Sequence, residues 1–408
     1  MLLDFTLSLL KAFGSKARAR ILCICRSNLL LRTVFISSLI IHSSEIKAEE
    51  RTSASNLSVD VSFIIVDLKY HPERGAQICE IQHGLVSAFK GHAMWHEGHD
   101  LIAQKFMDGI NGFYDTSWAA IDAFADPTIK ELLHEDTQWR KVTNFNAFDV
   151  NEEFQSFANL PVNDRTDLSK YHGFVYMSPL TNKGRDRFQN KYPGFVLVDN
   201  AFYGYVSNKY KMTELLMGHP LTEKHKPKWG IYDKNDTHLA EKINRQIGSD
   251  ILVIKPTDEY KGVGVIIVRK EELKSVLGFL FDKKDRKTPC SDPAYAYWKK
   301  GKASKFIVEE FIEVVPATIA HLDGKLYSPT MRLAFLLFYN KEQITINCLG
   351  GYYTLPRTAL SDPGSLNEHY KSCVCLPYYS KADPEIMKLA ESEITEVLKI
   401  IYQKLLKI

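Results

Sequence analysis

Short apolar runs alternate along the chain with amphipathic stretches, a pattern that predicts strands interleaved with helices. Runs of Val, Ile, Leu and Phe over about four to eight residues are typical of buried strands. They lie at 61–66, 173–177, 195–200, 251–254, 265–268, 306–312, 327–338 and 344–348. Amphipathic stretches at 207–217, 236–247, 271–281 and 383–407 predict helices. From residue 171 this spacing predicts an open α/β layer.

The last predicted helix has the clearest local signals. Asp383 followed by Pro384 is typical of an N-cap with proline at the first helical position. Its apolar residues recur at helical spacing and predict one buried stripe. The stripe comprises Ile386, Leu389, Ala390, Ile394, Val397, Leu398, Ile401 and Leu405.

The stretch from Asp250 to Val268, DILVIKPTDEYKGVGVIIV, predicts a hairpin with a flexible tip. The first strand ends with Lys255, Pro256 interrupts the hydrogen-bond ladder, and Gly262 and Gly264 form the tip. A lysine that faces a glycine loop can cradle a phosphate, because backbone N–H groups close over the anion. An ordinary surface hairpin fits the same residues.

A second hairpin is predicted near the start of the globular sequence. The strand at 61–66 leads to Asp67, and the return strand at 76–82 places Glu80 and Gln82 on one face because side chains alternate. Oxygen ligands on adjacent strands suit Mg²⁺ with bound phosphates. A solvated hairpin face is the alternative interpretation.

Composition limits the classes of function. The chain has 408 residues, 45% hydrophobic and 25% charged, which fits a soluble globular protein of two or three domains. A net charge of +3 argues against a nucleic-acid surface. Seven cysteines without framework spacing favour a reducing compartment, and the Cys-x-Cys pairs Cys23/Cys25 and Cys373/Cys375 lack the second half of a zinc-ribbon pattern.

Two further regions have competing interpretations. Residues 11–44 carry six basic and no acidic residues, and the apolar part at 29–41 is too short and interrupted for a membrane span. A signal or transit-like presequence and a simple amphipathic helix both fit this segment. We expect a cytoplasmic protein, and a presequence would make export or organelle import the alternatives. His92, His96 and His99 are spaced for one helix face, but Gly91 and Gly98 weaken such a helix, which favours surface or substrate-pocket histidines over a metal site.

Four segments, taken in order, resemble the ATP-grasp superfamily, the fold of D-alanine:D-alanine ligase, glutathione synthetase and the ribosomal-protein glutamate ligases. They are NKYKMTELL at 208–216, ILVIKPTDEYKGVGV at 251–265, FIVEEFIE at 306–313, and MRLAFLL at 331–337 with INCLGG at 346–351. They are similar to the lysine helix, the lysine strand with its glycine loop, the hinge strand, and the arginine strand with its N-x-x-G-G element. The resemblance covers residues 171–408.

The resemblance also implies where the metal ligands lie. In the family an aspartate strand and an E-x-N strand follow the last helix, whereas this sequence ends there. The segment FIIVDLKYHPERGAQICEIQHG at 63–84 resembles the missing piece, with Gln82 in place of asparagine. We therefore expect a circularly permuted fold in which Asp67 and Glu80 share one Mg²⁺ coordination sphere, beside Arg332 and Asn347.

The implied function is an ATP-dependent carboxylate-amine ligase that uses ATP and Mg²⁺. An ATP-grasp kinase of a small molecule and a non-catalytic nucleotide-binding protein are the alternatives. The resemblance implies that the metal ligands are Asp67, Glu80 and Gln82, and that the phosphates are bound by Lys209, Lys255, Gly262 and Gly264. It implies that adenine and ribose are bound by Glu310, Ile312 and Glu313. Arg332 would be the catalytic cation, beside Lys255. Arg357, Tyr352 and His92 are candidate contacts to a small-molecule or peptide carboxylate and its amine partner.

The expected fold class is α/β (α+β), an ATP-grasp fold of antiparallel sheets with flanking helices, circularly permuted, plus a mostly helical insertion. The expected division is a targeting-like segment at 1–56, metal-binding strands at 57–90, a helical or substrate-side segment at 91–170, an α/β part at 171–235, a nucleotide-binding lobe at 236–315 and a C-terminal lobe at 316–408. The sequence leaves the oligomeric state open.

Overall fold

The computed structural model describes residues 59–84, 91–92, 94, 101–111, 162, 164–171, 173–175, 182–206, 208–259, 262–281, 292–299 and 304–408. These residues belong to one structural unit and form a mixed α/β fold of antiparallel sheets with flanking helices. The segment 1–56, most of the helical segment 91–170, and His96 and His99 lie outside the described residues. No helix in the described ranges combines the length and the apolar character that crossing a membrane requires.

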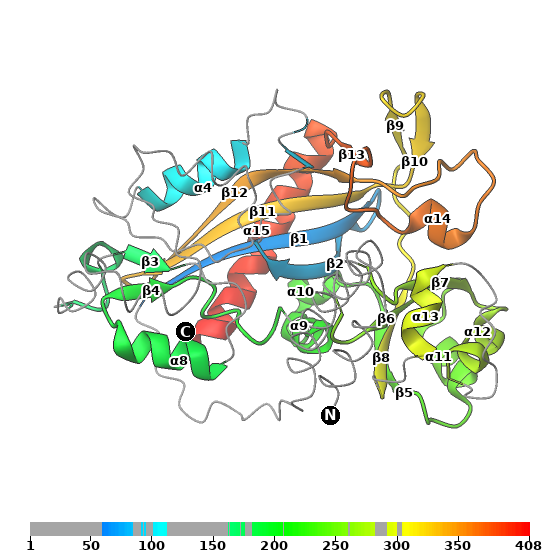
Figure 1. Cartoon of the computed structure of the whole chain (residues 1–408), viewed down its shortest axis with the longest axis horizontal. Helices are drawn as coiled ribbons and strands as arrows, with labels where there is room; N and C mark the ends of the chain where they lie inside the picture. Colours follow the sequence, from blue (N-terminus) through cyan, green and yellow to red (C-terminus); the bar gives the residue numbers. More distant parts are fainter. Residues whose placement is uncertain are drawn as a thin grey trace, which may run out of the picture. The chain divides into compact units, whose positions relative to one another are not determined.

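The central sheet has five strands in the order β13-β12-β11-β1-β2. Their bounds are Tyr379–Ser380 for β13, Gln343–Thr354 for β12, Thr330–Asn340 for β11, Val59–His71 for β1 and Gly75–His83 for β2. All neighbouring pairs are antiparallel. The predicted hairpin at the start of the globular sequence is present, and its first strand lies between its return strand and β11 (Figure 1).

Apolar side chains cover both faces of this sheet, because alternate residues of a strand point to opposite faces. On one face, Ile64, Val66 and Leu68 belong to a buried cluster with residues of α15 (Pro384–Leu406). On the other face, Phe63 and Ile65 are buried with residues of α4 (Leu101–Asn111). Figure 1 shows α15, in red, running diagonally across the strands.

The helix predicted at 383–407 is confirmed, including its cap. The Asp383 side chain accepts hydrogen bonds from the backbone N–H groups of Glu385 and Ile386, and Pro384 occupies the first helical position. The predicted stripe was wrong at Leu389, whose exposed fraction is 54%. The helix buries Tyr402 and Leu406 further along instead.

The second sheet has four strands in the order β5-β8-β6-β7. They are Trp229–Asp233, Lys305–Glu310, Ile251–Pro256 and Ile266–Arg269, respectively. The hairpin predicted at 250–268 is confirmed, because β6 and β7 pair antiparallel. Helices α11 (Leu239–Ile247), α12 (Leu273–Phe281) and α13 (Pro293–Lys299) supply residues to the apolar cluster of this sheet.

Shorter elements connect the two sheets. The 3-10 helix η1 spans Leu168–Lys170, and β3 (Gly173–Val175) pairs parallel with β4 (Phe195–Leu197). Helices α8 (Asn182–Lys191), α9 (Lys209–Leu216) and α10 (Pro220–Lys224) precede the second sheet. The hairpin β9 (Ala317–Ile319) and β10 (Lys325–Tyr327) and helix α14 (Leu366–Tyr370) belong to the C-terminal part.

Several predicted boundaries differ from the observed ones. The apolar run at 327–338 was predicted as one strand, but β10 ends at Tyr327 and β11 begins at Thr330. Pro329 between them has no N–H to donate to a ladder. The helices predicted to begin at Asp236 and Glu271 begin at Leu239 and Leu273.

Candidate active site

Four polar side chains stand opposite one another across four neighbouring strands of the central sheet. Arg332 on β11 pairs in register with Asp67 on β1. On the far side of Asp67 lies Glu80 of β2, and on the far side of Arg332 lies Tyr352 of β12. Directly opposed residues point to the same face, with Cβ atoms roughly 4.5–5.5 Å apart. These four residues therefore form one continuous cross-strand row.

Asp67 is held by two donors. Arg332 donates from Nε to Oδ1 at 2.7 Å and from Nη2 to Oδ2 at 2.8 Å, and Gln82 donates from Nε2 to Oδ2 at 2.9 Å. Burial opposes the charge of Arg332, but attraction to Asp67 outweighs it and raises the pKa of Arg332. Within the described part of the chain, Nη1 of Arg332 is buried without a hydrogen-bond partner. A buried donor of this kind costs free energy unless an acceptor reaches it.

Glu80 faces a lysine from the first turn of α9. Nζ of Lys209 lies 2.8 Å from Oε1 of Glu80 and also donates to the backbone carbonyl of Glu259. The helix is capped by Asn208, whose side chain accepts from the N–H of Lys211. The cap fixes where α9 begins, and so it places Lys209 against the edge strand β2.

A second lysine connects the two sheets. Lys255, at the end of β6, donates from Nζ to the carbonyl oxygen of Cys79 at 3.2 Å. Cys79 is the extra residue of a β-bulge, because Asp67 pairs with Glu80 while Leu68 pairs with Ile78. Bulges re-aim backbone groups next to active sites. This bulge turns a β2 carbonyl toward the lysine of the second sheet.

Glu309 on β8 binds two buried lysines. Lys255 Nζ lies 2.5 Å from Oε2 of Glu309, and Lys226 Nζ donates to Oε1. Burial opposes the charge of Lys255, but attraction to Glu309 outweighs it and raises the pKa of Lys255, whereas burial lowers the pKa of Lys226. Burial also opposes the charge of Glu309, but the two ammonium groups hold its pKa below the usual range. One carboxylate therefore positions two ammonium groups.

Positive charge exceeds negative charge where the sheets meet. Lys69 on β1 is buried and donates to the carbonyl oxygens of Ser328 at 3.3 Å and Pro329 at 3.0 Å. Burial lowers the pKa of Lys69 to about 8, so it is still largely protonated at neutral pH. Buried charges are usually paired. Among the described residues, Lys209 pairs with Glu80, Lys226 and Lys255 share Glu309, and Lys69 has backbone carbonyls as its hydrogen-bond acceptors.

Asp67 and Glu80 have the donor chemistry that Mg²⁺ prefers. The ion takes one or two carboxylates and completes its octahedron with phosphate oxygens and water. The two carboxylates project from opposed positions on adjacent strands, and each also faces a cation. Over the described ranges, no group of three or more His, Cys, Asp and Glu side chains is placed to hold a metal ion. The pair therefore fits an ion that arrives with phosphates, and not an all-protein cage.

The glycine tip predicted to cover phosphates lies between β6 and β7. Gly262 and Gly264 both have a φ of +71°, which favours glycine. The carbonyl of Gly264 accepts a hydrogen bond from Nε1 of Trp298 at 2.8 Å, which ties the tip to α13. After β8, Ile312 is buried and Glu313 is exposed.

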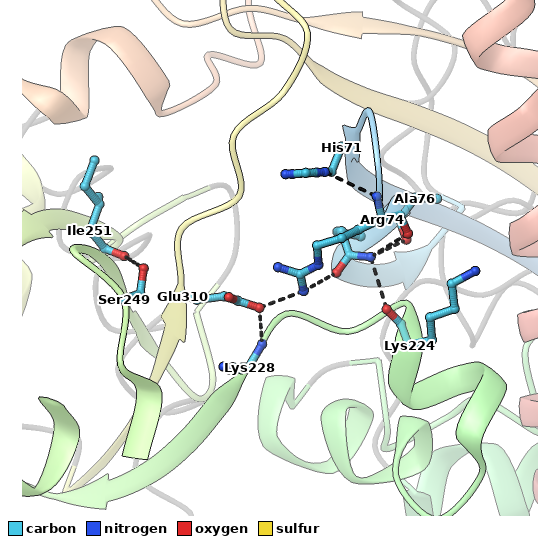
Figure 2. A network of polar contacts seen from close by, with 9 residues as sticks. His71, Arg74, Ala76, Lys224, Lys228, Ser249, Ile251 and Glu310 are labelled. Carbon is cyan, nitrogen blue, oxygen red and sulfur yellow. Dashed lines mark hydrogen bonds and ion pairs between the residues drawn. The ribbon is translucent and has the colours of Figure 1, made fainter. Parts of the chain in front are cut away.

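Glu310, predicted to contact adenine, has its carboxylate bound within the protein. Figure 2 shows Arg74, on the turn between β1 and β2, reaching this carboxylate. Nη2 of Arg74 and the backbone N–H of Lys228 both donate to Oε1 of Glu310 at 2.7 Å. Gln77 accepts from Arg74 at 2.9 Å and donates to the carbonyl of Lys224 at 3.1 Å. The network ties the β1–β2 hairpin to the second sheet.

The three candidate substrate contacts lie along β12 and beyond its end. Tyr352 is buried in the cross-strand row, with its ring 5.6 Å from that of Tyr379. His92 is buried beside the same strand, because a Cβ on Gly350 would lie 3.6 Å from its Nε2. Arg357 follows the end of β12 and is exposed.

One predicted neighbour of Arg332 is displaced. Asn347 pairs with Leu336, four residues along β11 from Arg332, and is exposed. The expectation that it lies beside Arg332 was wrong. Tyr352 is the residue of β12 opposite Arg332, and Asn347 comes five residues before Tyr352, so the antiparallel ladder places Asn347 further along β11 and away from Arg332.

Three residues of the site were not predicted from the sequence. They are Glu309, Lys226 and Lys69. The place of Glu309 becomes visible only in the structure, where Ile307 pairs with Lys255 and Glu309 lies two residues further on the same face. Lys226 precedes β5 in a segment without periodicity, and only the tertiary fold brings it to Glu309. Lys69 reads as an ordinary strand lysine until its burial is known.

Comparison with solved structures found similar chains. They include the D-alanyl-alanine synthetase A of Vibrio cholerae, with 10% identity, 70% of this chain and 80% of that chain covered, and a TM-score of 0.34. A glutathione synthetase-like effector from Globodera pallida has 10% identity, 74% of each chain covered and a TM-score of 0.39. The VanG D-Ala:D-Ser ligase of Enterococcus faecalis has 12% identity, 71% and 83% covered, and a TM-score of 0.36.

Neither a protein-family model nor a curated protein matches the sequence. At the identities and TM-scores given above, likeness to a solved structure establishes no activity for this chain.

Proposed function

We propose that the chain is an ATP- and Mg²⁺-dependent ligase that joins a carboxylate to an amine through an acylphosphate. The observation that carries the proposal is the surplus of buried ammonium groups beside the opposed carboxylates of Asp67 and Glu80. A polyphosphate with a divalent ion complements both features. The order of the sequence motifs supports the same conclusion, because segments that resemble separate ATP-grasp elements supply residues that lie together in space.

In this proposal the polyphosphate of ATP binds where the sheets meet. Lys209 and Lys255 neutralise the α- and β-phosphates, and the turn with Gly262 and Gly264 covers them. Asp67, Glu80 and Gln82 hold Mg²⁺, which supplies charge neutralisation between phosphate oxygens when bound. With the ion bound, Glu80 would help to hold it, and Lys209 would leave its pairing with Glu80 and bind a phosphate.

The adenine and ribose lie along the segment that follows β8. The Glu310 carboxylate already binds Arg74. We therefore assign the contact with the base to the backbone from Glu310 to Ile312 and not to this carboxylate. The exposed Glu313 accepts hydrogen bonds from ribose hydroxyls.

The chemistry proceeds in two transfers. A substrate carboxylate oxygen attacks the γ-phosphorus of ATP, and ADP leaves. Arg332, through the unpartnered Nη1, stabilises the charge that develops on the transferred group. The substrate amine then attacks the acyl carbon, an amide bond forms, and phosphate departs while the amine loses a proton. Tyr352, His92 and Arg357 are the proposed contacts to the two substrates.

We also propose that the fold is a circular permutation of the ATP-grasp arrangement. Its support is that β1 and β2 come first among the described strands, yet pair into one sheet with β11 and β12 near the C-terminus. The segments 57–90 and 316–408 then form one lobe and the segment 236–315 the other. Permutation is tolerated where chain ends are exposed.

The test is ADP release from the purified full chain with ATP and Mg²⁺, screened over amino acids, small amines and peptides. A ligase requires both a carboxylate and an amine for sustained turnover, and the amide product is then found by mass spectrometry. A kinase needs only a hydroxyl or phosphate acceptor. Lys255→Met should abolish turnover, whereas Lys274→Met, whose side chain is 84% exposed, should not. Turnover that persists in Lys255→Met would exclude this site.

A further inference from the structure

Two thiols meet on the loop between α14 and β13. The Sγ atoms of Cys373 and Cys375 lie 2.7 Å apart. Cys375 is exposed and Cys373 is half-buried, so reagents in solution can reach the pair. One residue separates the two cysteines, which limits their Cα atoms to about 7 Å, close to the upper bound of disulfide geometry. The backbone therefore permits a bond between them.

The loop keeps the thiols together by contacts on both sides. The N–H of Cys373 donates to the carbonyl of Leu355 at 2.8 Å, and the N–H of Tyr378 donates to the carbonyl of Cys375 at 2.9 Å. The hydroxyl of Ser372 lies 2.6 Å from that of Thr330 on β11. These contacts pin the segment to the end of the central sheet.

A guanidinium and a second thiol lie beside the Cys373 sulfur. The guanidinium of Arg357 forms a hydrogen bond with Cys373, and attraction to both sulfurs adds to it. The hydrogen bond with Cys373 raises the pKa of the Cys375 thiol. A nearby guanidinium and an S–H donor are the groups that activate a cysteine nucleophile.

A metal is a weaker interpretation of the pair. Structural zinc takes four ligands in a tetrahedron. In the part of the chain that the structure describes, no third His, Cys, Asp or Glu joins the two cysteines in a metal-binding group. Two neighbouring thiols without further ligands are suited to thiol–disulfide exchange instead.

We propose that Cys373 and Cys375 form a redox modification site, which a low-molecular-weight disulfide converts reversibly into an intraloop disulfide. The Cys373 thiolate attacks one sulfur of the small disulfide, whose S–S bond breaks, and a small thiolate leaves. Cys375 then loses its proton and attacks the Cys373 sulfur of the mixed disulfide, and the second small thiolate leaves. Two protein thiols are oxidised, and one small disulfide is reduced to two thiols. This proposal does not require the ligase reaction, although Arg357, a proposed substrate contact, lies beside the pair.

The experiment uses the folded full chain incubated with oxidised glutathione, followed by N-ethylmaleimide to block remaining thiols and by trypsin. Cleavage after Lys371 and Lys381 gives a peptide of residues 372–381 that contains Cys373 and Cys375 and no other cysteine. We expect this peptide without label and lighter than the dithiol form by two hydrogen atoms. Dithiothreitol before labelling should restore two labels. A peptide with two labels after oxidation, or with glutathione retained, would overturn the proposal.

Variants and an internal control sharpen the result. Cys375→Ser should stop the reaction at the mixed disulfide and retain glutathione on Cys373. Arg357→Gln should slow disulfide formation several-fold, and an unchanged rate would contradict the role of the guanidinium. Burial raises the pKa of Cys348 to about 12, so its peptide should stay free of glutathione in every folded variant. Glutathione on Cys348 identifies a misfolded variant. If Cys375→Ser misfolds in this way, Cys375→Ala replaces it.

Discussion

Arg332 and Asp67 face each other across the β11–β1 pair, joined by two parallel hydrogen bonds of 2.7 and 2.8 Å. The exposed fraction of the whole arginine residue is 4%. The pair joins strands from the two ends of the described sequence, and it stands at the centre of the cross-strand row. It therefore serves both the stability of the sheet and the geometry of the proposed site.

Breaking this pair should be costly. Asp67→Asn leaves a buried guanidinium without its countercharge, and we expect the free energy of unfolding to fall by roughly 3–5 kcal/mol. Urea denaturation measures the change. The double variant Asp67→Asn/Arg332→Met should recover much of the loss, because no unpaired charge remains.

The matched control is the exposed ion pair of Lys242 and Asp236, at 2.7 Å. Lys242→Met should change the free energy of unfolding far less than Asp67→Asn does, since exposed pairs contribute little. If Asp67→Asn costs no more than this control, the pair is not the buried interaction described here.

A buried carboxylate predicts a pH-dependent effect of Tyr402→Phe. Burial raises the pKa of Asp60 to about 6, and the Tyr402 hydroxyl donates to its Oδ2 at 2.6 Å. An acid with a raised pKa lowers stability as pH rises from its unfolded value of 3.8 through about 6, because the folded state holds the proton longer. The hydroxyl mainly stabilises the ionised form, so its loss matters most at higher pH.

We therefore expect Tyr402→Phe to lower the free energy of unfolding by about 1–3 kcal/mol at pH 8 and by less at pH 5. Denaturation of both proteins at the two pH values gives the comparison. A loss of equal size at both would show that Asp60 ionisation is not coupled to Tyr402.

Alanine substitutions at Gly264 and Gly218 compare the cost of backbone strain alone with the cost of strain plus steric crowding. Both have positive φ, at +71° and +84°. A Cβ on Gly264 would lie 2.6 Å from Cδ1 of Tyr297 and 3.1 Å from Cγ of Pro256, whereas a Cβ on Gly218 would meet nothing within 4 Å. Gly218→Ala should cost about 1–2 kcal/mol from strain alone. Gly264→Ala should cost more, and equal losses of stability by thermal unfolding would show that Tyr297 moves aside freely.

Local signals in the sequence were sufficient for several elements. The β-branched run before Asp67 and the alternation through Glu80 and Gln82 predict the first hairpin, because strand periodicity needs no knowledge of distant partners. The cap at Asp383 likewise predicts where α15 begins. The same reasoning predicted that Lys255 lies at the end of a strand, and in the structure it is the penultimate residue of β6.

Contacts that depend on the tertiary fold were harder to predict from the sequence. Burial of Leu389 depends on which side of α15 faces the sheet, and periodicity alone assigned it wrongly. The position of Asn347 depends on which residue of β12 lies opposite Arg332, and the alternation within a strand does not determine that register. Lys226 reaches Glu309 only through the packing of the loop before β5. These contacts depend on the assembled fold, whereas caps and alternation do not.

The most direct test of the account is a calorimetric titration of ATP into the full chain, with and without Mg²⁺. We expect binding that requires Mg²⁺ and weakens about 10- to 150-fold in Lys255→Met, the range for losing one charge-assisted hydrogen bond. Glu80→Gln should reduce the dependence on Mg²⁺, while Lys274→Met should bind as the parent does. ATP binding that is unaffected by Lys255→Met and Glu80→Gln, or no binding by the parent protein, would contradict a nucleotide site where the two sheets meet.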